Sequence, residues 1–102
     1  MKKFKPITVS EAERLIETCA PRILDCRELK DYRAGHIGEA MNLHKRLRET
    51  LILKGDKQCI YCYYGHASVH VAEMSCDFGF SDVFSLSGGY AGWKKFYQQL
   101  PS

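Results

Sequence analysis

Cys62 opens a short segment in which an apolar run passes directly into a helical pattern. Gly65 permits a turn with positive φ, so successive backbone N–H groups can point at one spot, and the following helix adds its unpaired N–H groups and positive dipole end. Such a loop holds anions and would lower the pKa of the Cys62 thiol from the free value of about 8.5. We therefore expect Cys62 to be a nucleophile rather than a buried structural cysteine. The expected anion-holding loop consists of Tyr63, Tyr64, Gly65, His66, Ala67 and Ser68.

Cys59 forms a CxxC pair with Cys62, which makes redox chemistry a rival interpretation. Cys59 falls inside an expected strand, where three steps of ~3.3 Å separate the two Cα atoms by roughly 10 Å, beyond the ~7 Å limit for a disulfide. The two-residue period of a strand also turns Cys59 to the opposite face. We therefore expect Cys59 to be a core residue, and we assign the same structural role to Cys76 and Cys19.

A cysteine-dependent phosphatase is the second rival. Those enzymes use a CxxxxxR loop, in which the Arg binds the phosphoryl oxygens through two hydrogen bonds. The corresponding position here is Ser68, which we expect to cap or begin the helix. The sequence argues against phosphatase or arsenate reductase activity, because the group that stabilises the transition state is missing.

Three other loop side chains have possible roles at the site. His66 would either donate to a bound anion or assist proton transfer near neutral pH, or it is an exposed histidine with no catalytic part. Tyr63 and Tyr64 are expected to form pocket walls, with hydroxyls able to bind an oxyanion.

His44 and His70 show no ligand spacing with the cysteines, so no metal site is expected.

Polar residues near the second apolar run are expected to be structural. Asp25 and Arg27 are interpreted as an ion-pair network at a strand end, with Glu28 or Asp31 as a partner of Arg27. His36 is expected to make a structural hydrogen bond at a turn.

Composition limits the classes of protein that the chain can represent. Its 102 residues, 45% hydrophobic and 26% charged, match one globular domain spanning 1–102. No run of about 18 apolar residues is present, so we expect a cytoplasmic protein without a membrane span. Five cysteines are expected to be reduced thiols. The net charge of +3 is too small to indicate nucleic-acid binding, and the basic cluster at 45–48 is interpreted as a solvated helix face or a docking patch.

Short apolar runs alternate with amphipathic segments along the chain. The predicted strands cover 7–9, 22–26, 40–43, 58–62 and 82–86, and the predicted helices cover 10–18, 28–34, 44–53, 67–78 and 89–100. Ser10 and Glu13 are interpreted as the capping box of the first helix. Strands separated by helices indicate a parallel sheet with helices on both faces. Ligands of such sheets bind at the carboxyl ends of the strands, where Cys62 falls.

Several motifs in this order give the chain a resemblance to single-domain rhodaneses, which are sulfurtransferases. Residues 23–28 (Ile-Leu-Asp-Cys-Arg-Glu) resemble the LDVRE strand of that family, residues 35–42 resemble its GHIPGAxN segment, and residues 88–93 resemble its GGxxxW segment. Cys62 and Gly65 match its CxxG loop. The resemblance covers nearly the whole chain. It implies an α/β, rhodanese-like fold with a central parallel five-stranded sheet and helices on both faces.

The resemblance implies that Cys62 carries a sulfane sulfur. Cys62 would take the sulfur from thiosulfate or a persulfide donor, become a persulfide, and pass the sulfur to cyanide, thioredoxin or another protein thiol. The resemblance implies no metal or organic cofactor, no nucleic acid and no membrane. The alternative is a rhodanese-like sulfur-relay or protein-interaction module with little turnover of small molecules.

The chain departs from the family pattern in ways that affect this expectation. Many thiosulfate-using rhodaneses carry Arg or Lys in the loop, whereas residues 63–68 contain neither. Slow thiosulfate turnover, with a neutral or protein-bound persulfide as donor, is therefore one expectation. Gly38 and Glu39 stand where Pro and Gly are usual, and we expect them near the mouth of the site. Cys26, which ends the neighbouring strand, would resolve a persulfide only if its side chain approaches Cys62.

Overall fold

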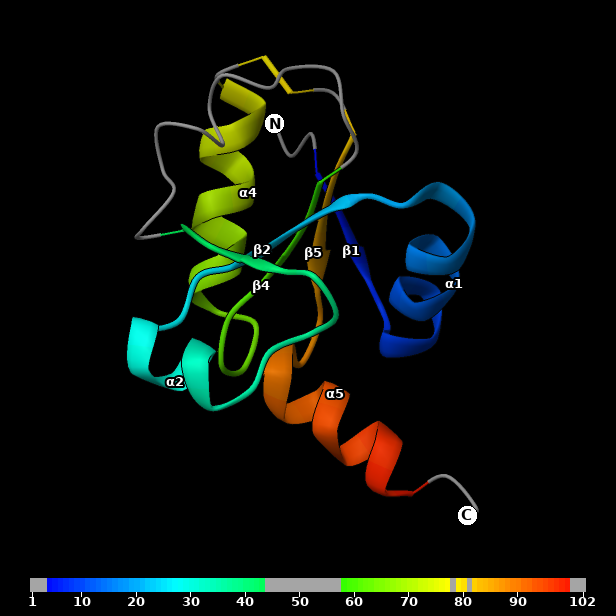
Figure 1. The fold of residues 1–102 in the computed structure, drawn as a ribbon. Coiled ribbons are helices and arrows are strands. Elements are labelled where there is room, and N and C mark those ends of the chain that lie inside the picture. Colours follow the sequence, from blue (N-terminus) through cyan, green and yellow to red (C-terminus); the bar gives the residue numbers. More distant parts are fainter. Residues whose placement is uncertain (1–3, 44–57, 78, 81, 100–102) are drawn as a thin grey trace.

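Figure 1 shows the computed structural model, which describes residues 4–43, 58–77, 79–80 and 82–99. The strands are β1 (Lys5–Ile7), β2 (Arg22–Asp25), β3 (Met41–Asn42), β4 (Gln58–Tyr61) and β5 (Val83–Leu86). They form a five-stranded sheet in the order β1-β5-β4-β2-β3, and every neighbouring pair is parallel. The α/β fold with a central parallel five-stranded sheet, expected from the sequence, is confirmed.

The helices are α1 (Val9–Cys19), α2 (Leu29–Ala34), α4 (Ala67–Asp77) and α5 (Gly89–Gln98). Because parallel neighbours cannot be joined by a tight hairpin, α4 provides the long connection between β4 and β5, and α1 carries the chain from β1 to the more distant β2. In the part of the chain that the structure describes, no helix has both the length and the apolar character of a membrane span. The predicted helix over 44–53 lies outside the described residues.

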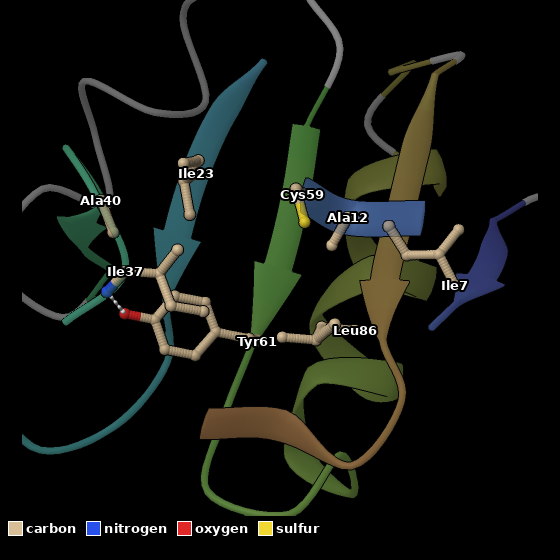
Figure 2. Packing of buried hydrophobic residues seen from close by; sticks show 8 residues of the cluster. All are labelled: Ile7, Ala12, Ile23, Ile37, Ala40, Cys59, Tyr61 and Leu86. Atoms are coloured by element: carbon tan, nitrogen blue, oxygen red, sulfur yellow. Dashed lines mark hydrogen bonds between the residues drawn. The ribbon is translucent and has the colours of Figure 1, made fainter. Parts of the chain in front are cut away.

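Helices cover both faces of the sheet, and each face has its own core (Figure 1). One face carries α1 and α5, and its buried residues are Ile7, Ala12, Ile23, Ile37, Ala40, Cys59, Tyr61 and Leu86 (Figure 2). The other face carries α4, and its buried residues are Phe4, Leu24, Ile60, Ala72, Cys76, Phe80 and Val83. Successive residues of β4 alternate between these two cores, as the period of a strand requires.

The start of α1 differs from the prediction by two residues. Thr8 is the N-cap: its hydroxyl accepts a hydrogen bond from the Glu11 N–H at 3.2 Å, and the Glu11 carboxylate accepts one from the Thr8 N–H at 2.9 Å. The capping box predicted at Ser10 and Glu13 is therefore wrong, and Val9 is helical rather than in a strand. Both pairs have the Ser/Thr-x-x-Glu spacing, so the spacing alone could not select between them.

A buried ion pair lies just after β2. Asp25 is 0% exposed and Arg27 is 4% exposed. The Arg27 guanidinium donates to both carboxylate oxygens of Asp25 over distances of 2.8 to 3.2 Å, and its Nη2 also donates to the Gly35 carbonyl at 2.6 Å. The interpretation of this pair as structural is confirmed. The predicted partners Glu28 and Asp31 are wrong, because Arg27 pairs with Asp25 through its Nε and Nη2 atoms.

Tyr61 extends the ion pair into a network that ties β2 to β4. Its hydroxyl donates to Asp25 Oδ2 at 2.5 Å and accepts a hydrogen bond from the Ile37 N–H at 3.1 Å (Figure 2). Burial, followed by the hydrogen bond to Asp25, raises the pKa of Tyr61, so the hydroxyl remains a donor. The network fixes the carboxyl ends of both strands, directly beside Cys26 and Cys62.

Tyr61→Phe tests this network because it leaves the buried Ile37 N–H without its partner and removes one of the hydrogen bonds that Asp25 accepts. We expect the free energy of unfolding in urea to fall by about 1–3 kcal/mol. Tyr97→Phe is the matched control, because the Tyr97 hydroxyl donates to Glu13 at a site where the tyrosine is 42% exposed. Its effect should stay within about 0.5 kcal/mol. Equal losses in the two variants would contradict a stabilising role for the buried network.

Candidate active site

Cys62 directly follows β4 and lies at the carboxyl end of the parallel sheet. The loop of residues 63–66 joins it to Ala67, the first residue of α4, and runs between α2 and the start of α5 (Figure 1). Gly65 has a φ of 97°, and a Cβ atom at this position would lie 3.1 Å from the backbone nitrogen of Gly88. The turn that brings the loop back to Cys62 therefore requires glycine.

Hydrogen-bonding groups from the loop and from α4 surround the Sγ atom of Cys62. The Gly65 N–H donates to Sγ at 3.1 Å, and Ser68 Oγ lies 3.6 Å from Sγ. Ser68 Oγ is in turn 3.0 Å from Ser85 Oγ on β5, and Cys62 is only 3% exposed. A thiol at Cys62 donates to Ser68, whereas a thiolate accepts from it. The pair of buried serines can therefore serve either protonation state of the cysteine.

These contacts set the charge of Cys62. Burial by itself raises the pKa of the thiol, because an enclosed thiolate loses hydration. Hydrogen bonds from the backbone N–H and hydroxyl of Ser68, and from the N–H groups of Gly65 and Tyr64, outweigh burial, so the pKa of Cys62 lies below its ordinary value. By contrast, burial raises the pKa of Cys59 to about 12. The pKa shifts therefore favour the thiolate form at Cys62 and the neutral thiol at Cys59.

The predicted loop residues contribute unequally. Tyr64, Gly65 and Ser68 supply the hydrogen bonds to the sulfur. Ala67 begins α4 and is exposed, and His66 is exposed as well. Ser68 is the second residue of α4, close to its expected place at the helix start, and its buried hydroxyl also contacts the candidate nucleophile, a role that the sequence did not reveal.

Tyr63 and Tyr64 line a cavity, as the sequence predicts. The hydroxyl of Tyr63 donates to the Asp31 carboxylate and accepts from the Glu28 N–H at 3.4 Å. It is therefore already engaged and does not fit the predicted role of binding an oxyanion. Tyr64 is 68% exposed and lies at the surface of the loop.

The start of α5 holds the backbone on which Cys62 sits. The Tyr90 N–H donates to the Cys62 carbonyl at 2.8 Å, and the Ala91 N–H donates to the Tyr63 carbonyl at 3.0 Å. A Cβ atom at Gly89 would lie 2.5 Å from the Cys62 carbonyl oxygen, so only glycine allows this close approach. The positioning role of Gly89 was missed from the sequence, although the Gly-Gly pair at the helix start was the available signal.

A cavity of about 730 Å³ opens beside the loop. Its lining includes the rings of Tyr63, Tyr64 and Tyr90 and the cationic side chains of Arg27, Lys94 and Lys95. The guanidinium of Arg27 lies 4.0 Å from the ring centroid of Tyr90, and its charge is paired with Asp25. The lysines therefore supply the positive charge that residues 63–68 lack. Sequence reasoning missed them because only the fold brings α5 against the loop.

The remaining cysteines divide into core and exposed positions. Cys59 and Cys76 are buried, one in each core, as expected. The structural role predicted for Cys19 is wrong, because Cys19 is exposed. It is the last residue of α1 and lines an open cavity with Pro21 and Arg22 instead of packing under the helix.

Cys26 differs from the other thiols because it lies close to the candidate nucleophile. It is half-buried and packs against the core under α4. Burial, followed by the negative charges of Cys62 and Asp25, raises the pKa of Cys26 to about 12. Cys26 therefore remains a neutral thiol beside Cys62.

The segment 35–42 contributes one structural histidine and two residues that lie away from the site. Nδ1 of His36 is 2.8 Å from the Tyr32 carbonyl oxygen and the two rings stack, which confirms the structural role expected for His36. Gly38 and Glu39 line a cavity with Arg22 at the amino end of β2. Their expected place near the mouth of the site is wrong, because Cys62 lies at the opposite, carboxyl end of the sheet.

Among residues 4–43, 58–77, 79–80 and 82–99, no group of three or more His, Cys, Asp or Glu side chains is arranged to hold a metal ion. The described site offers a polarised thiol, a ring of N–H donors and two neighbouring lysines. These groups suit nucleophilic attack by sulfur, followed by stabilisation of a negative charge on a group attached to it.

Comparison with known proteins gives consistent matches. A family model of the rhodanese-like domain matches residues 8–96. The chain is 32% identical over 96 residues to a protein of Shewanella oneidensis named thiosulfate sulfurtransferase GlpE, covering 91% of this chain and 95% of the relative. It is 34% identical over 94 residues to a protein of the same name from Coxiella burnetii, covering 89% and 88%. The solved structure of a rhodanese-like domain protein from Staphylococcus aureus is similar with a TM-score of 0.76 and 26% identity, over 88% of this chain and 91% of that one.

The family model covers most of the chain, and the relatives match over nearly their full length with the same parallel α/β fold. This chain belongs to the rhodanese-like domain family.

Proposed function

We propose that this chain is a sulfurtransferase that moves a sulfane sulfur from thiosulfate or a persulfide donor to a thiophilic acceptor through a persulfide on Cys62. The observation that carries the proposal is the arrangement around Sγ, where the Gly65 N–H lies at 3.1 Å and the Ser68 hydroxyl at 3.6 Å. Donors that hold a thiolate also suit the negative charge of a persulfide. The relatives named thiosulfate sulfurtransferase support the same reaction class.

Loading of the site is a displacement at sulfur. The Cys62 thiolate attacks the outer sulfur of thiosulfate, a new S–S bond forms, and the original S–S bond breaks with its electron pair leaving on sulfite. Cys62 then carries a persulfide anion, and the charge balances because thiosulfate and sulfite are both dianions. The Gly65 N–H and the Ser68 hydroxyl, which donate to the thiolate, would then donate to the charged persulfide.

Unloading returns the thiolate. A nucleophile such as cyanide, thioredoxin or another protein thiol attacks the outer sulfur, and Cys62 leaves as the thiolate that the loop already stabilises. We place this exchange in the cytoplasm, where acceptor thiols stay reduced. Because the low pKa makes Cys62 a good leaving group, the same contacts assist both halves of the cycle.

The charges beside the loop bear on the choice of donor. Lys94 and Lys95 line the adjacent cavity and would attract an anionic donor or acceptor.

A sulfur-relay module with little turnover of small molecules is the second candidate function. The near-complete enclosure of Cys62, at 3% exposed, favours it, because a partner that reshapes the loop would reach the sulfur more easily than a small anion.

Sulfur loading is the direct test of the proposal. Reduced wild-type protein incubated with thiosulfate, and separately with a low-molecular-weight persulfide, should gain the mass of one sulfur atom in intact mass spectrometry. Dithiothreitol should reverse the gain, and Cys62→Ser should lose it completely. Loading by the persulfide but not by thiosulfate would favour the relay function. No gain from either donor would refute the sulfurtransferase.

The depressed pKa of Cys62 predicts a shifted pH profile for alkylation. The thiolate reacts with the alkylating reagent and the thiol does not, so the alkylation rate falls as the pH drops through the pKa. The midpoint of this fall at Cys62 should lie at a lower pH in the folded protein than in the same protein unfolded in urea. Ser68→Ala removes a hydrogen bond to the thiolate and should move this midpoint upward. Iodoacetamide labelling with peptide mapping measures both profiles. Ser75→Ala is the matched control, since Ser75 is another buried serine of α4, and its profile should equal that of wild type.

Gly89 should be essential for the geometry of the loop. Gly89→Ala puts a Cβ atom 2.5 Å from the Cys62 carbonyl oxygen and 2.7 Å from backbone atoms of Tyr63, so the loop must move. We expect the rate of sulfur transfer to fall at least about a hundredfold. Gly92→Ala is the matched control in the same helix, because the nearest atom to its Cβ lies at 3.8 Å. Its rate should stay near that of wild type, and similar losses in both variants would contradict the proposed role.

A further inference from the structure

Cys26 and Cys62 occupy equivalent places on neighbouring strands. β2 and β4 are paired in register with Asp25 opposite Tyr61, and the Cys26 N–H donates to the Tyr61 carbonyl at 2.8 Å as the last hydrogen bond of the ladder. The two cysteines are the next residue on each strand. They therefore leave the sheet side by side at its carboxyl end.

The two side chains also lie on the same face. Tyr61 packs in the core under α1 and α5, so the next residue on its strand turns toward α4, where Sγ of Cys62 contacts Ser68. Cys26 packs against the core under α4. Neighbouring strands lie about 4.8 Å apart, and this spacing falls within the ~4.4–6.8 Å between Cα atoms that a disulfide needs. The charge of one thiol acts on the pKa of the other, which is consistent with this proximity.

We propose that Cys26 is a resolving thiol that attacks the Cys62 persulfide, releases hydrogen sulfide and leaves a Cys26–Cys62 disulfide. The inference rests on the proposed function, since it requires a persulfide at Cys62. It adds a second outlet for the bound sulfur besides transfer to an external acceptor.

The step balances without any further reactant. The proton of the Cys26 thiol passes to the outer sulfur of the persulfide anion, and the Cys26 sulfur attacks Sγ of Cys62. The bond between Sγ and the outer sulfur breaks, and the outer sulfur leaves with the electron pair as hydrosulfide. In this step the Cys26 sulfur is oxidised by one electron, the outer sulfur is reduced by one, and Sγ of Cys62 keeps its oxidation state. An external dithiol must then reduce the disulfide to start a new cycle.

The unequal environments of the two thiols give them an order of action. The Cys62 pKa is lowered and that of Cys26 is raised, so Cys62 is the thiol that meets the sulfur donor first and Cys26 does not compete for it. Once the persulfide exists, Cys26 is a proton source and an attacking group on the same side of the sheet. Intramolecular attack replaces a bimolecular encounter, so a weakly acidic thiol can still react.

The test follows the fate of the bound sulfur. Wild-type protein is loaded with thiosulfate or a low-molecular-weight persulfide, freed of excess donor, and held without air or added thiol. We expect the intact mass to lose the added sulfur together with two hydrogens, one equivalent of sulfide to appear in solution, and peptide mapping to find Cys26 linked to Cys62. In Cys26→Ser and Cys26→Val, the persulfide should persist at least about tenfold longer.

Cys59→Ala is the matched control, because Cys59 lies on β4 but packs in the opposite core, and its persulfide should decay as in wild type. A wild-type protein that takes up sulfur but keeps it as long as Cys26→Ser overturns the inference alone. Sulfur found as a persulfide on Cys26, or a disulfide that joins other cysteines, overturns it as well. No uptake of sulfur by any form overturns the proposed function and the inference with it.

Discussion

Cys62 is 3% exposed, so a thiolate there loses nearly all of its hydration unless the protein replaces that water with its own hydrogen-bond donors. The loop after β4 does this with the N–H groups of Tyr64, Gly65 and Ser68 and the Ser68 hydroxyl. The donors converge on the sulfur only because Gly65 adopts a φ of 97° and α4 begins directly afterwards. At the start of α5, the N–H groups of Tyr90 and Ala91 then donate to the carbonyl oxygens of the same segment. Each of these elements serves the single requirement of a charge held in an enclosed place.

The order of the strands explains why residues from several segments surround Cys62. β4 lies between β5 and β2. From β5 come Ser85, which supports Ser68, and the Gly-Gly start of α5. From β2 come Cys26 and the ion pair of Asp25 and Arg27. A cysteine at an edge strand would have a neighbour on one side only, so the same loop sequence there could not collect these contacts.

The local parts of this arrangement were predictable from the sequence, and the long-range parts were not. The glycine turn, the parallel sheet and the position of Cys62 at its carboxyl end depend on residue types and periods within short windows, and they were predicted correctly. The choice between Thr8 and Ser10 as N-cap failed because both fit the same spacing. The lysines of α5 and the close approach of Gly89 to Cys62 depend on contacts between segments far apart in the chain. The exposure of Cys19 depends on where α1 ends relative to the sheet, which no local pattern encodes.

The contrast between Cys26 and Cys62 shows how burial, when backbone donors offset it at only one of two similar thiols, shifts their pKa values in opposite directions. Both follow a paired residue on adjacent strands, and both face α4. The chain after Cys62 turns back and aims its N–H groups at the sulfur, whereas the N–H of Cys26 is already bonded to Tyr61 and the preceding Asp25 is negatively charged. One thiol therefore gains a set of donors and the other gains a repulsive neighbour. The pKa values of two chemically identical side chains a strand apart shift in opposite directions, and this difference gives a direction to any sulfur exchange between them.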